Sequence, residues 1–205
     1  MKKLRLGEFE RNSLVVFAIT MIANVLSYLY QIVMGNVLTP ADYGTVNTLL
    51  SLSVVVGVPS GIISALTATY TAKYHAHGET FAIAAFMHGM LRVAAVLAAI
   101  VFVVGALLSR PIAHVLQIDD PHYVTVVMVL VASNCLGPVF SSTLQGVKRF
   151  IPYSMNSVLS FAFRLLLGVI FVWLGWGIPG ALAALILAAC LTMLYCLFKS
   201  RDLFF

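Results

Sequence analysis

The residues from Ala82 to Leu108 read AIAAFMHGMLRVAAVLAAIVFVVGALL, and this stretch decides the fold. An α-helix rises about 1.5 Å per residue, so about 20 apolar residues cross the roughly 30 Å hydrocarbon core of a bilayer. The stretch is longer than that and carries a single charged residue, Arg92. It therefore predicts a helix that spans a membrane.

Five further stretches are long and apolar enough to span a membrane, and turn-like residues separate them. The six predicted spans are residues 13–37, 44–69, 82–108, 123–146, 151–173 and 177–198. The chain is 61% hydrophobic and 9% charged, against about 45–50% and about 25% in soluble domains. The sequence therefore predicts an all-α membrane protein, a six-transmembrane-helix bundle with an N-terminal segment, residues 1–12, and a C-terminal tail, residues 199–205.

The basic residues predict the orientation of these helices, because short cytoplasmic loops carry an excess of lysine and arginine. If the N-terminus is cytoplasmic, the inner segments hold nine of them: Lys2, Lys3, Arg5, Arg11, Lys73, Lys148, Arg149, Lys199 and Arg201. The outer loops then hold only Arg110. Both termini are therefore predicted to be cytoplasmic. Since the basic residues adjoin apolar spans, their expected partners are membrane lipids and not nucleic acid.

Polar residues recur along several spans at helical spacing, so each set lies on one helix face. A polar side chain within a bilayer usually faces protein or a water-filled cavity. Those predicted to face a cavity are Asn24, Tyr28, Gln31, His88, Asn134, Ser157 and Ser160. The alternative is that such side chains only hydrogen-bond neighbouring helices. The span 177–198 has almost no polar residues, so we expect it to be peripheral.

Arg164 is the most informative of these polar residues. It lies 13 residues beyond Ile151, roughly 20 Å into the hydrocarbon by the helical rise, too deep to reach the interface easily. An arginine at the bilayer centre costs about 2.5–3.5 kcal/mol on insertion scales. No Asp or Glu lies in any predicted span, so the counter-anion of Arg164 should come from outside. We expect Arg164, with Arg92 and His88, to form a cationic cavity wall for an anionic ligand.

Helix-breaking residues interrupt two of the predicted spans. Gly57, Pro59 and Gly61 lie near the middle of the second span, and Pro138 lies in the fourth. A proline leaves one backbone carbonyl without its partner and permits a bend. Two interpretations of these four residues are equally open: they form hinges, or they form static kinks that serve only helix packing.

The sequence offers no pattern for catalysis. His75 and His77 are two residues apart, so they diverge on a helix, and no nearby carboxylate or cysteine completes a metal site. No nucleophile motif and no pair of intramembrane acids is present. The sequence therefore predicts a protein that is not an enzyme and that has no metal or cofactor.

Three stretches, taken in order, resemble one family of transporters. They are GNVLTPADYG at residues 35–44, LQGVKRF at residues 144–150 and GWGIPGA at residues 175–181. Together with the buried Arg164, they are similar to the Wzx-like polysaccharide-export flippases of the MOP superfamily, which also contains the MATE drug exporters. Members of that family have 12 to 14 helices in two six-helix lobes, so this chain resembles the N-terminal lobe.

The resemblance implies a function and several partners. It implies the flipping of an anionic polyprenyl-pyrophosphate-linked oligosaccharide across the bacterial cytoplasmic membrane for surface polysaccharide biosynthesis. It also implies a second six-helix lobe, either another chain or a missing C-terminal half. The resemblance does not decide whether transport is coupled to protons, to sodium or to the membrane potential.

One different function class fits the predicted helices. A six-helix substrate-binding component of a vitamin or metal transporter would be complete at 205 residues. Such a protein would hold its binding residues near the outer face, whereas the polar stripes here extend along the helices. The flippase lobe is therefore the favoured prediction, with this component as the alternative.

Overall fold

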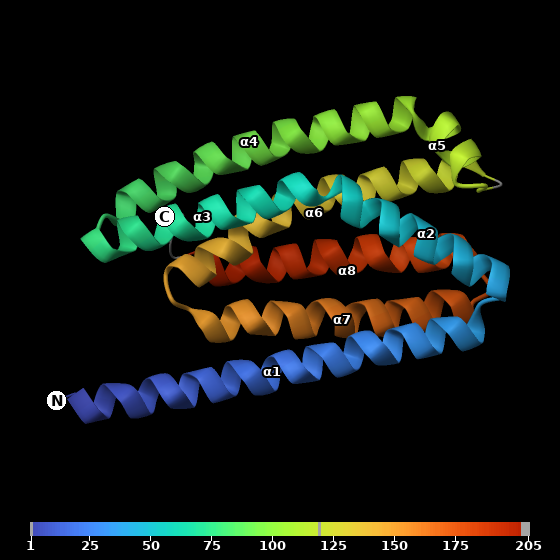
Figure 1. Ribbon diagram of the computed structural model, residues 1–205. Helices are drawn as coiled ribbons and strands as arrows, with labels where there is room; N and C mark the ends of the chain where they lie inside the picture. Colours follow the sequence, from blue (N-terminus) through green and yellow to red (C-terminus); the bar gives the residue numbers. More distant parts are fainter. Residues whose placement is uncertain (1, 119, 202–205) are drawn as a thin grey trace.

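The helices of this chain lie side by side in one elongated bundle (Figure 1). The computed structural model describes residues 2–118 and 120–201, with side chains from residue 13 onward except at residue 80. Within these residues every regular element is a helix, which confirms the predicted all-α fold. The helices are α1 (Lys2–Val37), α2 (Pro40–Val56), α3 (Val58–His77), α4 (Thr80–Leu107), α5 (Ser109–Val115), α6 (Pro121–Gly146), α7 (Phe150–Trp173) and α8 (Gly177–Ser200).

Six membrane spans can be formed from these helices. Helices α1, α4, α6, α7 and α8 are each long and apolar enough to cross a bilayer, and α2 with α3 passes as one span bent by 48°. The largest differences from the predicted boundaries lie in three places. The first helix begins at Lys2 and not at residue 13, the second span runs to His77 and not to residue 69, and α5 forms where only a loop was expected.

The bend between α2 and α3 lies at Gly57, with Pro59 in the first turn of α3. Pro59 has no amide hydrogen, so the backbone hydrogen bonds of α2 cannot continue through this point. The Ser60 hydroxyl instead donates to the Gly57 carbonyl at 2.6 Å. The predicted break is therefore confirmed here, whereas α6 continues as one helix through Pro138. Whether either position acts as a hinge stays a prediction.

Basic and acidic residues are unevenly distributed between the two ends of the bundle. The start of α1, the end of α8 and the α3–α4 and α6–α7 turns lie at one end (Figure 1). That end carries Lys148, Arg149 and Lys199, whereas the opposite end carries Asp42 and Asp120 beside Arg110. That the first end is cytoplasmic stays a prediction from the distribution of basic residues.

The turn between α1 and α2 is built from the first motif of the sequence. Thr39 caps α2, because its hydroxyl oxygen accepts from the Asp42 amide at 3.2 Å and its hydroxyl donates to the Asp42 carboxylate at 2.8 Å. Pro40 occupies the first turn, where the lack of an amide hydrogen does no harm. The ring of Tyr43 lies over Gly35 of α1. These contacts give the motif a structural role in the helical hairpin.

Helix α6 is the centre of the bundle, and α8 packs directly against it. The buried apolar residues form three clusters, and α6 contributes to each of them. The expectation that the last span is peripheral is wrong, because Ala181, Ala184 and Ala188 of α8 are fully buried. Small side chains let helices approach closely within a membrane. A helix without polar residues can therefore be packed inside the bundle as readily as exposed to lipid, and α8 is packed.

Large apolar side chains cover much of the outer surface. Phe81 and Trp173 are each 87% exposed, and Leu107 is 77% exposed. In water such a surface would drive aggregation, because monomeric soluble proteins rarely expose large continuous apolar patches. The same surface is stable against lipid acyl chains, as expected for a multi-pass membrane protein.

Gly146 allows a close approach of α3 and α6. A Cβ atom at this position would lie 2.7 Å from Thr71 Cβ and 2.9 Å from the Ala68 carbonyl oxygen. The side chain of Thr71 is fully buried in this contact. The glycine of the second motif therefore serves helix packing at the basic end of the bundle.

We predict that Gly146→Ala destabilises the protein, because the added methyl group forces α3 and α6 apart. Overpacking of this kind costs about 1–3 kcal/mol, which lowers the thermal unfolding midpoint by several degrees in detergent. The matched control is Gly61→Ala, since a Cβ at Gly61 meets nothing within 4 Å. Equal midpoints for the two variants would contradict this account of the contact.

Candidate functional site

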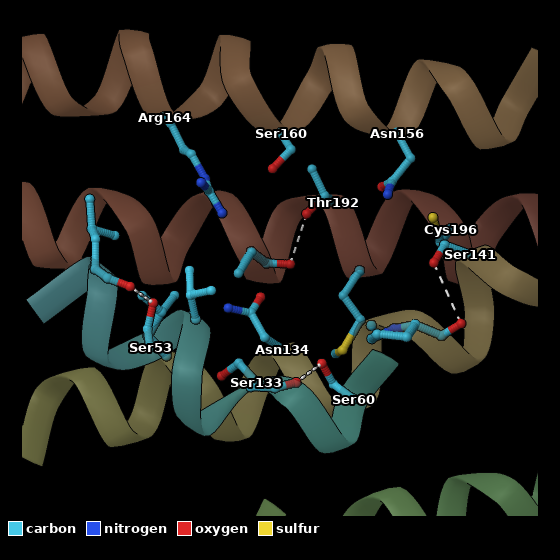
Figure 2. Close-up of a pocket in the computed structure, with 18 residues that line it drawn as sticks. Ser53, Ser60, Ser133, Asn134, Ser141, Asn156, Ser160, Arg164, Thr192 and Cys196 are labelled. Atoms are coloured by element: carbon cyan, nitrogen blue, oxygen red, sulfur yellow. Dashed lines mark hydrogen bonds between the residues drawn. The ribbon is translucent and has the colours of Figure 1, made fainter. Parts of the chain in front are cut away.

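A cavity of about 580 Å³ lies between α7, α8, α6 and the break that joins α2 to α3. Figure 2 shows its polar lining. The labelled residues are Ser53, Ser60, Ser133, Asn134, Ser141, Asn156, Ser160, Arg164, Thr192 and Cys196. A volume of about 300–1,000 Å³ is typical of small-molecule sites, so the cavity is large enough for a ligand.

Helix α7 supplies one wall of this cavity. Asn156, Ser160 and Arg164 are four residues apart, so they lie on one helix face. All three side chains point from α7 toward α8 and α6 (Figure 2). Helix α1 packs against α7 one turn beyond Arg164, where Gly168 lies close to Met34 and Tyr30. The stripe of α7 that faces the cavity therefore ends where α1 packs against it.

Arg164 places a charged group in this cavity without a carboxylate partner among the described residues. Its Nε atom is buried and has no hydrogen-bond partner among the described residues. The guanidinium lies 5.6 Å from the centre of the Phe161 ring, a cation–π contact that leaves the N–H groups available. The carboxylates that the structure describes, on Asp42, Glu79 and Asp120, lie at helix ends. The cavity therefore offers a cation to an anionic ligand.

Several hydroxyls on the other walls are bonded to their own helices. Ser53 donates to the Leu50 carbonyl at 2.6 Å, and Thr192 donates to the Ala188 carbonyl at 2.8 Å. Ser133 donates to the Val129 carbonyl at 2.9 Å. Such bonds are common for Ser and Thr within helices, and they leave the hydroxyl oxygen free to accept.

The structure brings together three of the nine predicted site residues. Arg164, Ser160 and Asn134 line this cavity, and so do the hinge candidates Gly57 and Pro138. Ser157, one position after Asn156, is exposed on a different face of α7. Pro59 and Gly61 lie beside the break without lining the cavity.

The polar stripe of α1 does not belong to this cavity. Asn24, Tyr28 and Gln31 are exposed, and Tyr28 is 65% accessible. Helix α1 packs against α7 through Tyr30 and Met34, which leaves the polar stripe on its outward side. The expectation that this stripe shares a cavity with Arg164 is therefore not met in this bundle.

His88 and Arg92 also lie outside this cavity, on the exposed face of α4. Helix α4 packs on α6 and α3 through Met87 and Ala94, so residues on its other face point outward. The Nδ1 atom of His88 lies 2.8 Å from the Ala84 carbonyl oxygen of its own helix. Arg164 is therefore the one arginine that lines this cavity.

Sequence reasoning missed Asn156 and Ser53. A helical stripe through Ser160 and Arg164 can continue through either Ser157 or Asn156. These two residues lie three and four positions before Ser160, and both spacings are compatible with one helix face. The fourfold spacing of Asn156, Ser160 and Arg164 was the available signal. Ser53 and Ser60 face the cavity because α2 bends at Gly57.

The bundle is similar to part of two solved transporters. It matches a MOP superfamily transporter from Pyrococcus furiosus with a TM-score of 0.71 and 16% identity, over 90% of this chain and 43% of that one. It also matches an outward-facing multidrug resistance MATE family transporter of the MOP superfamily, with a TM-score of 0.69 and 19% identity, over 92% and 45%. This chain therefore has the fold of one six-helix lobe and spans less than half the length of either transporter.

None of the curated proteins matches this sequence. The MOP fold leaves the alternative of a six-helix vitamin or metal component without support. A family model described as polysaccharide biosynthesis protein matches residues 9–204. The two similar structures are those of membrane transporters and not of enzymes, in keeping with the prediction from the sequence. The chain belongs to the polysaccharide biosynthesis protein family.

Proposed function

We propose that this chain is one lobe of a flippase that moves an anionic polyprenyl-pyrophosphate-linked oligosaccharide across the bacterial cytoplasmic membrane. The observation that carries the proposal is Arg164, a guanidinium inside a polar cavity without a carboxylate partner among the described residues. The polysaccharide biosynthesis family supports the carbohydrate part of the cargo.

A polar head group crosses hydrocarbon only if protein groups replace its water. Burial of an unpaired charge is too costly, so the path must supply both hydrogen bonds and an opposite charge. A guanidinium meets this need for phosphate, because its N–H groups match the phosphate oxygens in a bidentate geometry. The serine and asparagine side chains of the cavity supply hydrogen bonds to the sugar.

The second half of the transport path comes from another six-helix lobe. This chain spans 43% and 45% of the two MOP transporters it matches, so a complete pair of lobes needs a further bundle. The exposed polar stripe of Asn24, Tyr28 and Gln31 on α1 is a candidate surface for that lobe, since polar residues are costly against lipid. Alternating access between the lobes would then carry the head group across, with the polyprenyl tail in the bilayer.

We predict that the chain binds a polyprenyl-pyrophosphate-linked sugar and that Arg164→Ala weakens this binding by about 10–100-fold, the effect of a lost charge-assisted hydrogen bond. Arg164→Lys should retain part of the affinity, because it keeps the charge without the bidentate geometry. Native mass spectrometry of the chain in nanodiscs of neutral lipid measures the bound fraction.

The control for this measurement is Arg92→Ala, which removes an exposed arginine outside the cavity. It should leave the affinity unchanged, and uncharged polyprenol should not bind to any of the variants. Equal binding by the parent chain and by both Arg164 variants would contradict the proposal.

We also predict that co-expression of the chain with a C-terminal lobe of the same family restores surface polysaccharide to a strain lacking its flippase. The parent chain should restore the polymer, and Arg164→Ala should leave lipid-linked intermediates on the cytoplasmic side at equal protein levels. Immunoblotting of the polymer and extraction of the intermediates provide the readouts. Full restoration by Arg164→Ala would contradict a role for this residue in transport.

A further inference from the structure

Two side chains of α7 that line the cavity each contain a buried polar atom without a hydrogen-bond partner among the described residues. The Nε atom of Arg164 and the Oδ1 atom of Asn156 are both buried, and neither has a hydrogen-bond partner among the described residues. Both residues line the cavity, and Ser160 lies between them on the same helix face (Figure 2). Buried polar atoms are rarely left unsatisfied, so this pair indicates a ligand with two separate polar parts.

The other walls of the cavity mainly accept hydrogen bonds. Ser53, Ser60 and Thr192 each donate their single hydroxyl hydrogen to a carbonyl of their own helix. The oxygen lone pairs that remain can only accept. A ligand that satisfies these walls therefore carries hydrogen-bond donors, and sugar hydroxyls are such donors. The same ligand needs an anion at Arg164, since a guanidinium has no acceptor.

We propose that the cavity binds a glycosyl phosphate head group at two points, with the phosphoryl group at Arg164 and the sugar at Asn156, and that Asn156 determines which sugar is preferred. The proposal rests on the proposed function, because both place the anion of the cargo at Arg164. The Asn156 carboxamide both donates and accepts, so it can distinguish a hydroxyl from an acetamido substituent.

The dimensions of the cavity agree with a head group of this size. Asn156 and Arg164 are eight residues apart, which corresponds to roughly 12 Å along the helix. That separation spans a phosphoryl group and one or two sugar rings. The cavity volume of about 580 Å³ holds a head group of this kind but not a long polymer. Asn156 lies nearer the cytoplasmic end of α7, so the sugar lies on that side of the phosphoryl group.

Calorimetric titration of the full chain in neutral nanodiscs tests the proposal with three soluble probes: inorganic pyrophosphate, glucose 1-phosphate and N-acetylglucosamine 1-phosphate. The parent should prefer one sugar phosphate over the other by about fivefold, the effect of one hydrogen bond. Asn156→Ala should reduce this preference to less than about twofold and leave pyrophosphate affinity unchanged. Arg164→Gln should weaken binding of all three probes by about tenfold or more.

Ser157→Ala is the matched control, because Ser157 adjoins Asn156 in sequence and lies outside the cavity. It should leave the sugar preference and pyrophosphate affinity unchanged. Asn156→Ser serves as a second variant, with unfolding midpoints measured for both, and it should lose the preference as well.

A parent chain without a sugar preference, or a preference that survives in both Asn156 variants, overturns the assignment of Asn156. If pyrophosphate still binds in an Arg164-dependent manner, the proposed function stands while this inference fails. If the parent binds none of the three probes, both the inference and the anion site of the proposed function fail.

Discussion

A guanidinium inside the membrane without a protein counter-charge is the constraint on which the function of this chain depends. Arg164 lies 14 residues after Phe150, roughly 21 Å along α7, and its Nε atom is buried without a partner among the described residues. A charge in this position is tolerated where water or an opposite charge reaches it. The cavity beside α7 supplies the space for both, and an anionic cargo supplies the opposite charge.

The rest of the bundle builds that cavity. Helix α6 packs against both α3 and α8, with Gly146 and the alanines of α8 allowing close contact. The break at Gly57 turns α3 away from α2 by 48° and brings Ser53 and Ser60 to the cavity. Helix α1 packs against α7 at Gly168, one turn beyond Arg164, and Asn156 and Arg164 line the cavity. The packing of these helices thus places polar side chains around a cavity in an otherwise apolar bundle.

The sequence predicts the helices well and the site in part. Hydropathy and turn residues identify all the spans, because the bilayer requires about 20 apolar residues for each. They do not show that α8 is central, since lipid and a packed core are equally apolar. Asn134, Ser160 and Arg164 were predicted for the cavity and line it, whereas Asn156 was missed and His88 and Arg92 of α4 lie outside it. Helical periodicity groups residues onto faces, but only the packing of neighbouring helices decides which face turns inward.

The central claim is that the Arg164 guanidinium binds an oxyanion within the cavity. Crystals of the full chain soaked in tungstate, a heavy analogue of phosphate, test it most directly through the anomalous difference map. The account predicts a peak within hydrogen-bond distance of the Arg164 guanidinium, on the side of Ser160, and loss of that peak in Arg164→Ala crystals. An empty map at this position, with the guanidinium directed into acyl chains or fully bonded to backbone carbonyls, would contradict it.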